Sequence, residues 1–125
     1  MRQNYRRGKD ISPGAYYVAG YAIELAFKAA IASQFRENEI PDKTLVNNVY
    51  THNLVSLLKL AGLEKPLELD CQKDPELERR WSIVKNWSEE ARYAIWTEEQ
   101  TRAIIDAIDG DRQIGGLFQW LSARW

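Results

Sequence analysis

Cysteine and histidine are scarce in this sequence, and their scarcity excludes several kinds of site. Among its 125 residues there is one cysteine, Cys71, and one histidine, His52. A single cysteine cannot form a disulfide within the chain, so we expect a reducing compartment and predict a cytoplasmic location. One His and one Cys cannot supply the ligands of a usual zinc site within one chain. We therefore predict no metal site and no cofactor.

The short motifs of several enzyme classes are also missing. The sequence has no Gly-rich phosphate loop of the P-loop or dinucleotide type and no GxSxG nucleophile elbow. Acidic pairs do occur at Glu89-Glu90 and Glu98-Glu99. Adjacent residues of a helix point about 100° apart, so we interpret these pairs as solvated acids or as acids at helix starts.

Neither sign of charge is in excess. Seventeen basic and eighteen acidic side chains give a formal net charge of −1. Strong nucleic-acid binding usually shows as a basic excess on one face, and the total charge predicts none. The N-terminus is a local exception, because its first residues include Arg2, Arg6, Arg7 and Lys9. Such a segment could contact nucleic acid, but a basic start of this kind is more often a solvated tail, and we interpret residues 1–11 as a flexible tail of that type.

A long uninterrupted hydrophobic run is absent as well. The most apolar stretch is PGAYYVAGYAIELAFKAAI, from Pro13 to Ile31, and it is interrupted by Glu24 and Lys28. This falls short of the roughly 20 apolar residues that a membrane span needs. The N-terminus also lacks the apolar core of a signal peptide. We expect no membrane association.

Glycine and proline divide the rest of the sequence into helical blocks. No stretch shows the sustained alternation of a half-buried strand, and no repeat is visible. We predict one all-α domain over residues 1–125, an up-and-down antiparallel bundle of four to five helices.

The expected helices follow from cap residues and apolar spacing. Ser12 and Pro13 begin the first helix, which we expect to end near Glu37, and Asp42 to Asn48 are predicted to form a short helix. Thr51 or Asn53 caps the next helix, which stops at Gly62 and buries one leucine-rich face. Residues 63–73 are predicted to be a connecting loop.

The second half of the chain begins its helices with equally clear signals. Asp74 and Pro75 start one helix, and Thr97 with Gln100 fits a capping box at the start of the last. Asp109 and Gly110 could end this last helix, or it could continue through Ile114, Phe118 and Leu121 with weak points at Gly110 and Gly115-Gly116. Of the two alternatives we favour one long, kinked helix.

Four polar residues lie in apolar surroundings: Glu24, His52, Arg92 and Tyr93. Each has a structural interpretation, since Glu24 can pair with Lys28 at i,i+4 and His52 can cap or pack. The alternative is that they meet. A carboxylate is costly to bury alone, so we hypothesise that Glu24 pairs with Arg92 or His52.

Three segments carry a family resemblance. The run AYYVAGYAIELAFKAAI is similar to the Y-x-A-G-Y-x-x-E-x-x-L-K-A pattern of HEPN domains, with Phe27 in place of leucine. THNLVSLLKLAG is similar to H-[DN]-L-x-x-L-x-x-x-A, and WSEEARY to W-x-x-x-x-R-Y. The three appear in family order between residues 15 and 95. The sequence therefore resembles a HEPN domain.

The resemblance implies a helical bundle that forms a homodimer and is associated with nucleotide or RNA chemistry. Many HEPN proteins are ribonucleases, often toxins paired with a nucleotidyltransferase-like partner protein. They use an R-x(4–6)-H motif on a late helix. This chain departs from that pattern, because its late helix has Arg102 and Arg112 but no histidine. It resembles a branch without the usual nuclease motif.

Two kinds of function follow from the resemblance and its departure. The first is a dimerising module that binds a nucleotide or RNA near Glu24, His52, Arg92 and Tyr93, without the usual nuclease activity. The alternative is a ribonuclease, or a toxin–antitoxin or defence component, that uses a rearranged His52 and Arg92 site.

Overall fold

The computed structural model describes residues 14–34, 47–110 and 115–124, and these residues are helical without any strand. The expected all-α class is confirmed. The described elements, in chain order, are α2 (Ala15–Ala32), α4 (Leu54–Leu60), α5 (Glu64–Lys73), α6 (Pro75–Val84), the 3₁₀ helix η1 (Glu89–Tyr93), α7 (Glu98–Asp109) and α8 (Leu117–Ser122).

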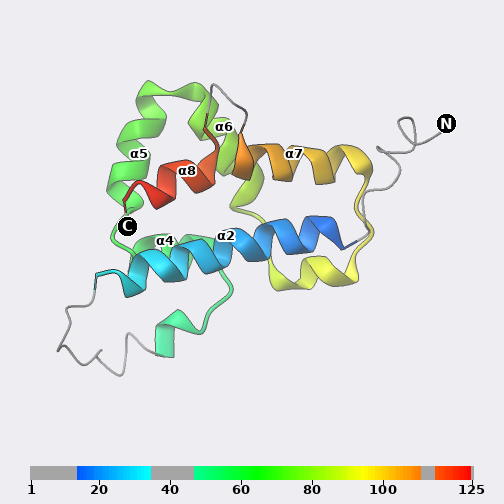
Figure 1. Ribbon diagram of the computed structural model, residues 1–125, viewed down its shortest axis with the longest axis horizontal. Coiled ribbons are helices and arrows are strands. Elements are labelled where there is room, and N and C mark those ends of the chain that lie inside the picture. The colour runs from blue at the N-terminus through cyan, green and yellow to red at the C-terminus, as the bar shows by residue number, and fades with distance from the viewer. Residues whose placement is uncertain (1–13, 35–46, 111–114, 125) are drawn as a thin grey trace.

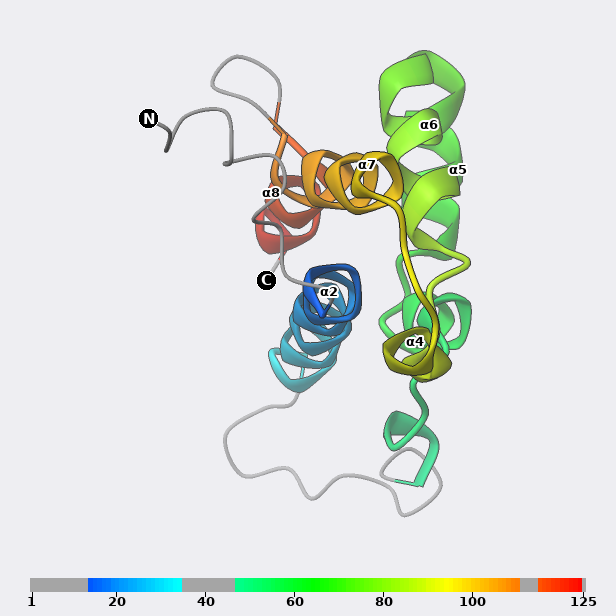
Figure 2. The same ribbon diagram turned by 90° about the vertical axis from the view of Figure 1, so that its right-hand side faces the viewer.

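Helix α2 is the central helix around which four other elements pack. It packs against α4, α7, α8 and η1, whereas α6 packs against α5, α7 and α8. Figures 1 and 2 show α7 and α8 above α2, with the α5–α6 pair standing crosswise to one side. Buried apolar side chains from these helices form one hydrophobic cluster. Since α2 contributes to most of these contacts, its residues position much of the rest of the fold.

Several helix starts are as the sequence predicts. The Asn53 side chain accepts a hydrogen bond from the Ser56 N–H at 2.9 Å, so Asn53 is the cap of α4. The Asp74 carboxylate accepts from the backbone at the start of α6, next to Pro75. Thr97 and Gln100 form the reciprocal capping box that begins α7. These caps depend on neighbours in the sequence, which is why the pattern predicted them.

The expected start of the first helix at Ser12 and Pro13 lies outside the described residues, as does most of the short helix expected over residues 42–48. The expected end near Glu37 is wrong, because the helix ends earlier, with Ser33 as its C-cap. Within the described part α2 ends at Ala32, and residues 47–49 are helical. The leucine-rich face of α4 is buried as expected.

The prediction of a loop over residues 63–73 is wrong, because Glu64–Lys73 form helix α5. Pro66 lies in the first turn of this helix, where its missing N–H has no intrahelical partner to lose. Leu67 alone in α5 is buried, so the helix carries a weak periodic signal. Leu63, Leu67 and Cys71, spaced by four, are the signal that would have found it.

The prediction of one long last helix is also wrong, and the alternative, an end at Asp109 and Gly110, is confirmed. Helix α7 ends at Asp109, and Gly110 has φ +74° and ψ −158°, a backbone conformation that glycine adopts far more easily than other residues. A bridge joins Gly110 to Gly115, and α8 then begins at Leu117. Residues with a β-carbon rarely adopt this conformation, so Gly110 separates two helices where we expected a kink.

Candidate functional site

Glu24 is buried in the middle of α2 with only 1% of its surface exposed. Its Oε2 lies 3.1 Å from the Lys28 Nζ, one turn along the same helix. The same oxygen lies 2.9 Å from the His52 Nδ1, and the other carboxylate oxygen lies 3.0 Å from it. The carboxylate therefore has two cationic or hydrogen-bonding partners, which offset the cost of burying it.

His52 joins two carboxylates. Its Nδ1 faces Glu24, and its Nε2 lies 3.3 Å from the Glu89 Oε2 in η1. The Nδ1 contact with Glu24 is a hydrogen bond, whereas the Nε2 contact with Glu89 is an ion pair only when the ring is protonated on both nitrogens. Through this ring the segment before α4 connects α2 to η1. Pairing of Glu24 with His52, one of the two partners that we hypothesised, is confirmed.

Arg92 and Tyr93 do not reach this pair. Among the described residues, Glu24 pairs with Lys28 and His52 and not with Arg92. The Arg92 Nη2 donates to the Tyr93 hydroxyl at 2.6 Å, and its guanidinium lies 4.8 Å from the centre of the Tyr93 ring. Tyr93 is 75% exposed. The two residues form a separate exposed pair on the surface of η1.

The environment of Arg92 favours its charged form. The hydrogen bond to the Tyr93 hydroxyl, with further attraction from Tyr17 and Glu89, raises the pKa of Arg92 above its ordinary value. Arg92 therefore presents a permanent positive charge beside an exposed aromatic ring. Such a pair can contact a phosphate and stack on a base.

Gly20 and Trp87 are a second point where the motif residues meet. A β-carbon built at position 20 would collide with the indole ring of Trp87. Trp87 is buried, and its ring also lies 5.7 Å from the ring of Tyr17. The Trp87 side chain of the third motif segment therefore packs against Gly20 of the first, and the missing β-carbon of Gly20 permits this close approach.

A cleft of about 440 Å³ lies beside the histidine. We call it the His52 cleft; its lining residues are Tyr50, Thr51, His52, Asn53, Trp87, Ser88, Glu89 and Glu90. Arg92 is not among them, so His52 and Arg92 do not face one cleft. Two glutamates give the cleft a negative wall, which disfavours a phosphate group inside it.

Sequence reasoning missed Glu89, which was interpreted as a solvated acid. It is more than half exposed, yet it provides the second carboxylate of the His52 pair. No local pattern distinguishes it from Glu90, because the contact joins segments that are distant in sequence. Within the described residues, no group of three His, Cys, Asp or Glu side chains is arranged to hold a metal ion.

Within the part of the chain that the structure describes, no helix combines the length and apolarity needed to cross a membrane.

Comparison with known proteins leaves the family open. Neither a family model, nor a curated protein, nor a solved structure matches this chain. The resemblance to HEPN domains therefore depends on the three motif segments, whose residues Gly20, Glu24, His52 and Trp87 take part in the contacts between α2, the start of α4 and the segment before η1.

Proposed function

We propose that this chain is a HEPN-like bundle that forms a homodimer and binds nucleotide or RNA without the usual nuclease activity. The observation that carries the proposal is the outer face of α2. One face of this helix packs into the core, while Val18, Tyr21 and Leu25 are large apolar side chains exposed on another. A helix that is apolar all round is normally buried, so α2 has an apolar face still to be covered.

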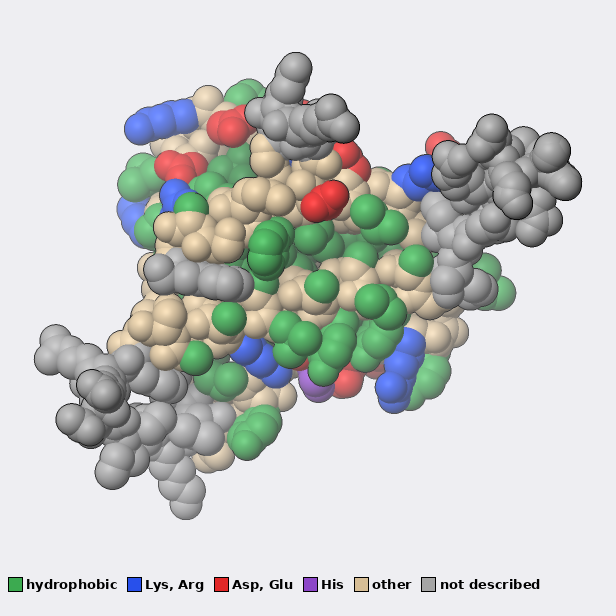
Figure 3. Space-filling model, viewed as in Figure 1, with side chains coloured by type: hydrophobic (Ala, Val, Ile, Leu, Met, Phe, Trp, Pro, Cys, Tyr) green, Lys and Arg blue, Asp and Glu red, His purple; other side chains and the backbone are tan. Residues whose placement is uncertain are grey.

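The position of this face fits a symmetric pair of helices. Val18, Tyr21 and Leu25 follow the i, i+3, i+7 spacing of one helical stripe. Figure 3 shows hydrophobic side chains gathered along the surface over α2. A two-fold interface uses the same patch on both copies, and a single continuous stripe is a patch of that kind. We refer to it as the α2 stripe.

Sedimentation velocity tests the dimer. Wild type is expected to sediment as twice the 14.5 kDa chain, and Leu25→Glu as a monomer with unchanged helical circular dichroism. Leu69→Glu is the matched control, since Leu69 lies on α5 and is 46% exposed against 48% for Leu25. A monomeric wild type, or equal effects of the two substitutions, would contradict the proposed interface.

Nucleotide or RNA association is assigned to Arg92 and Tyr93. An exposed tyrosine ring can stack on a base, and the guanidinium beside it can contact a phosphate. Anisotropy of a fluorescein-labelled single-stranded RNA measures this, with binding expected to weaken in Arg92→Ala and Tyr93→Ala. Arg79→Ala removes a charge elsewhere and should bind nearly as wild type does. RNA that binds all four proteins equally would argue against the assignment.

The geometry of His52 favours a binding module over the alternative ribonuclease. A general base needs a nitrogen that is free to take a proton from the substrate, and both ring nitrogens of His52 face carboxylates. An RNA-cleavage assay without metal, on wild type, His52→Ala and Arg92→Ala, separates the two functions. Cleavage that both folded variants lose would establish the ribonuclease, and no cleavage by any of them supports the binding module.

If the chain is part of a toxin–antitoxin pair, we propose a nucleotidyltransferase-like protein as its partner. This partner is implied by the family resemblance, and co-purification with the product of the neighbouring gene tests it.

A further inference from the structure

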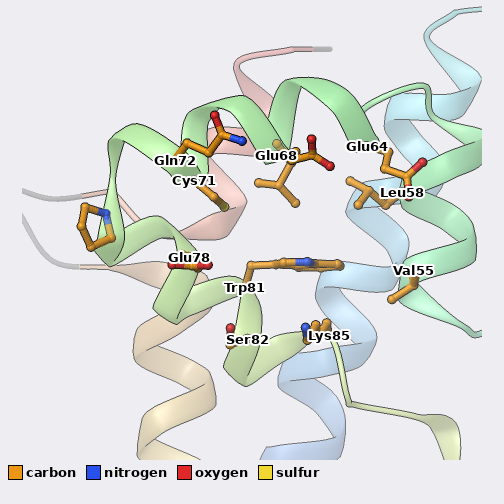
Figure 4. Close-up of a pocket in the computed structure, with 12 residues that line it drawn as sticks. Val55, Leu58, Glu64, Glu68, Cys71, Gln72, Glu78, Trp81, Ser82 and Lys85 are labelled. Carbon is orange, nitrogen blue, oxygen red and sulfur yellow. The ribbon is translucent and has the colours of Figure 1, made fainter.

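A groove of about 680 Å³ lies between α4, α5 and α6, away from the His52 cleft and the α2 stripe. We call it the Trp81 groove. Its apolar lining comes from all three helices: Leu58 and Leu67 are buried in the core beneath it, and Val55 and the Trp81 ring are partly exposed. Figure 4 shows the indole lying across the groove, with Cys71 and Glu68 from α5 on one side and Ser82 and Lys85 on the other.

The rim of the groove is acidic. Three glutamates, Glu64, Glu68 and Glu78, line it together with one cation, Lys85. Glu64 and Glu68 have exposed lysine neighbours at 3.9 Å and 3.4 Å, which are weak surface pairs. Glu78 makes no ion pair with any residue in the described ranges. The groove therefore combines an apolar floor with a carboxylate that is available for a cation.

The pKa of the Cys71 thiol, which lines the groove, is raised in part by nearby carboxylates. Burial raises the pKa of its thiol, and the carboxylates of Glu78, Asp70 and Asp74 raise it further. Negative charge stabilises the neutral thiol over the thiolate, so these carboxylates act at the groove wall as well as at the surface.

We propose that the Trp81 groove binds a basic segment of a partner protein, which inserts a lysine or arginine side chain toward Trp81 and Glu78. The charged head of such a side chain is attracted by the carboxylates and by the face of an indole ring. Its aliphatic stem, and apolar neighbours in the same segment, cover the partly exposed Val55 and Trp81 side chains.

The apolar floor argues for a peptide over a bare cation. A metal ion or a small ammonium ion would satisfy the carboxylates but would leave the partly exposed Val55 and Trp81 side chains uncovered. Charge complementarity and apolar contact together require a ligand with both features, and a short basic, leucine-containing segment has them.

Nuclear magnetic resonance of the ¹⁵N-labelled chain tests this proposal through the indole N–H signal of Trp81, assigned with Trp81→Phe. The probe is an acetylated peptide of alternating leucine and lysine, and its leucine–glutamate counterpart is the control. We expect a saturable shift with the first peptide and none with the second. No saturable shift, or equal shifts with both, would overturn the proposal.

Two charge reversals locate the binding. Glu78→Lys should weaken the leucine–lysine peptide by about tenfold, while Glu99→Lys, with the same change of net charge on α7, should change it little. Equal weakening by both would show a non-specific charge effect and would overturn the assigned groove. Saturation by N-acetyl-lysine amide as tight as by the peptide would exclude an extended segment as the ligand.

Sedimentation of Glu78→Lys distinguishes a separate partner from a second copy of the chain. Self-association equal to that of wild type supports a separate partner. If this substitution abolished self-association while Leu25→Glu did not, the ligand would be a second copy, and both the partner proposed here and the α2 interface would be wrong.

Discussion

The indole ring of Trp87 occupies the space that a β-carbon at position 20 would fill, so α2 and the segment before η1 are packed together at a glycine. Tyr17, one turn before Gly20 on α2, also contacts the Trp87 ring. The Glu24 carboxylate lies one turn after it and pairs with His52. The contacts of α2 with the two other motif segments therefore lie within two turns of Gly20.

Gly20→Ala tests that contact. Alanine is a better helix former than glycine by about 1 kcal/mol, yet we expect a net loss of about 2 kcal/mol in the free energy of unfolding, because the buried Trp87 ring must move. Urea unfolding measures it. Ala22→Gly, at an exposed position of the same helix, gives the propensity effect alone. A Gly20→Ala variant more stable than wild type would show that the ring does not lie there.

Glu24→Gln is expected to lower the free energy of unfolding by about 2 kcal/mol, since it removes the charge from a buried group with two partners. Thermal and urea unfolding give the value. Glu90→Gln is the control, because Glu90 is exposed and its loss should change stability by less than about 0.5 kcal/mol. Equal stability of Glu24→Gln and wild type would mean that the pairs with Lys28 and His52 contribute nothing.

Arg80 and Arg79 provide a matched pair on α6. Both reach Asp106 of α7, but the side chain of Arg80 is 4% exposed and that of Arg79 is 50% exposed. Arg80 also donates from Nη1 to the Asp106 carbonyl oxygen. Arg80→Ala should cost about 2 kcal/mol or more, because it removes a buried side chain with its hydrogen bond to the Asp106 carbonyl and leaves a cavity behind, whereas Arg79→Ala should cost less than about 1 kcal/mol.

The comparison is made by urea unfolding of both variants under the same conditions. Similar losses for the two would contradict the interpretation that burial, and not the shared ion pair with Asp106, decides the contribution of each arginine.

Cys71 should react slowly with iodoacetamide. Burial first, and then Glu78, Asp70 and Asp74, raise the pKa of its thiol, so less thiolate is present in the folded chain than in the unfolded chain at the same pH. The unfolded thiol loses its proton near pH 8.5. Between that value and the higher folded pKa the unfolded state is stabilised by ionisation, and the free energy of unfolding should fall with rising pH.

Alkylation rates over a pH series, in buffer and in urea, measure the effect. The midpoint should be higher in the folded chain and should decrease in Glu78→Gln, where one of the carboxylates is removed. Coincident midpoints for folded and unfolded chains would refute the prediction.

The sequence alone determined the features that depend on near neighbours. The caps at Asn53, Asp74 and Thr97, the buried leucine face of α4 and the all-α class follow from hydrogen bonds and side-chain spacing within one or two turns. These features can be predicted from the sequence because the residues that form each hydrogen bond or share each helix face lie three or four positions apart.

Tertiary structure decided the rest. The choice of His52 over Arg92 as partner of Glu24, the part played by Glu89, and the ring that fills the space beside Gly20 all join segments far apart in the chain. No spacing rule fixes such contacts, since they depend on how whole helices pack. Helix α5 has only a weak sequence signal, the spacing of Leu63, Leu67 and Cys71, because Leu67 is its one buried residue. The surface that α5 shares with α4 and α6 forms the groove at Trp81.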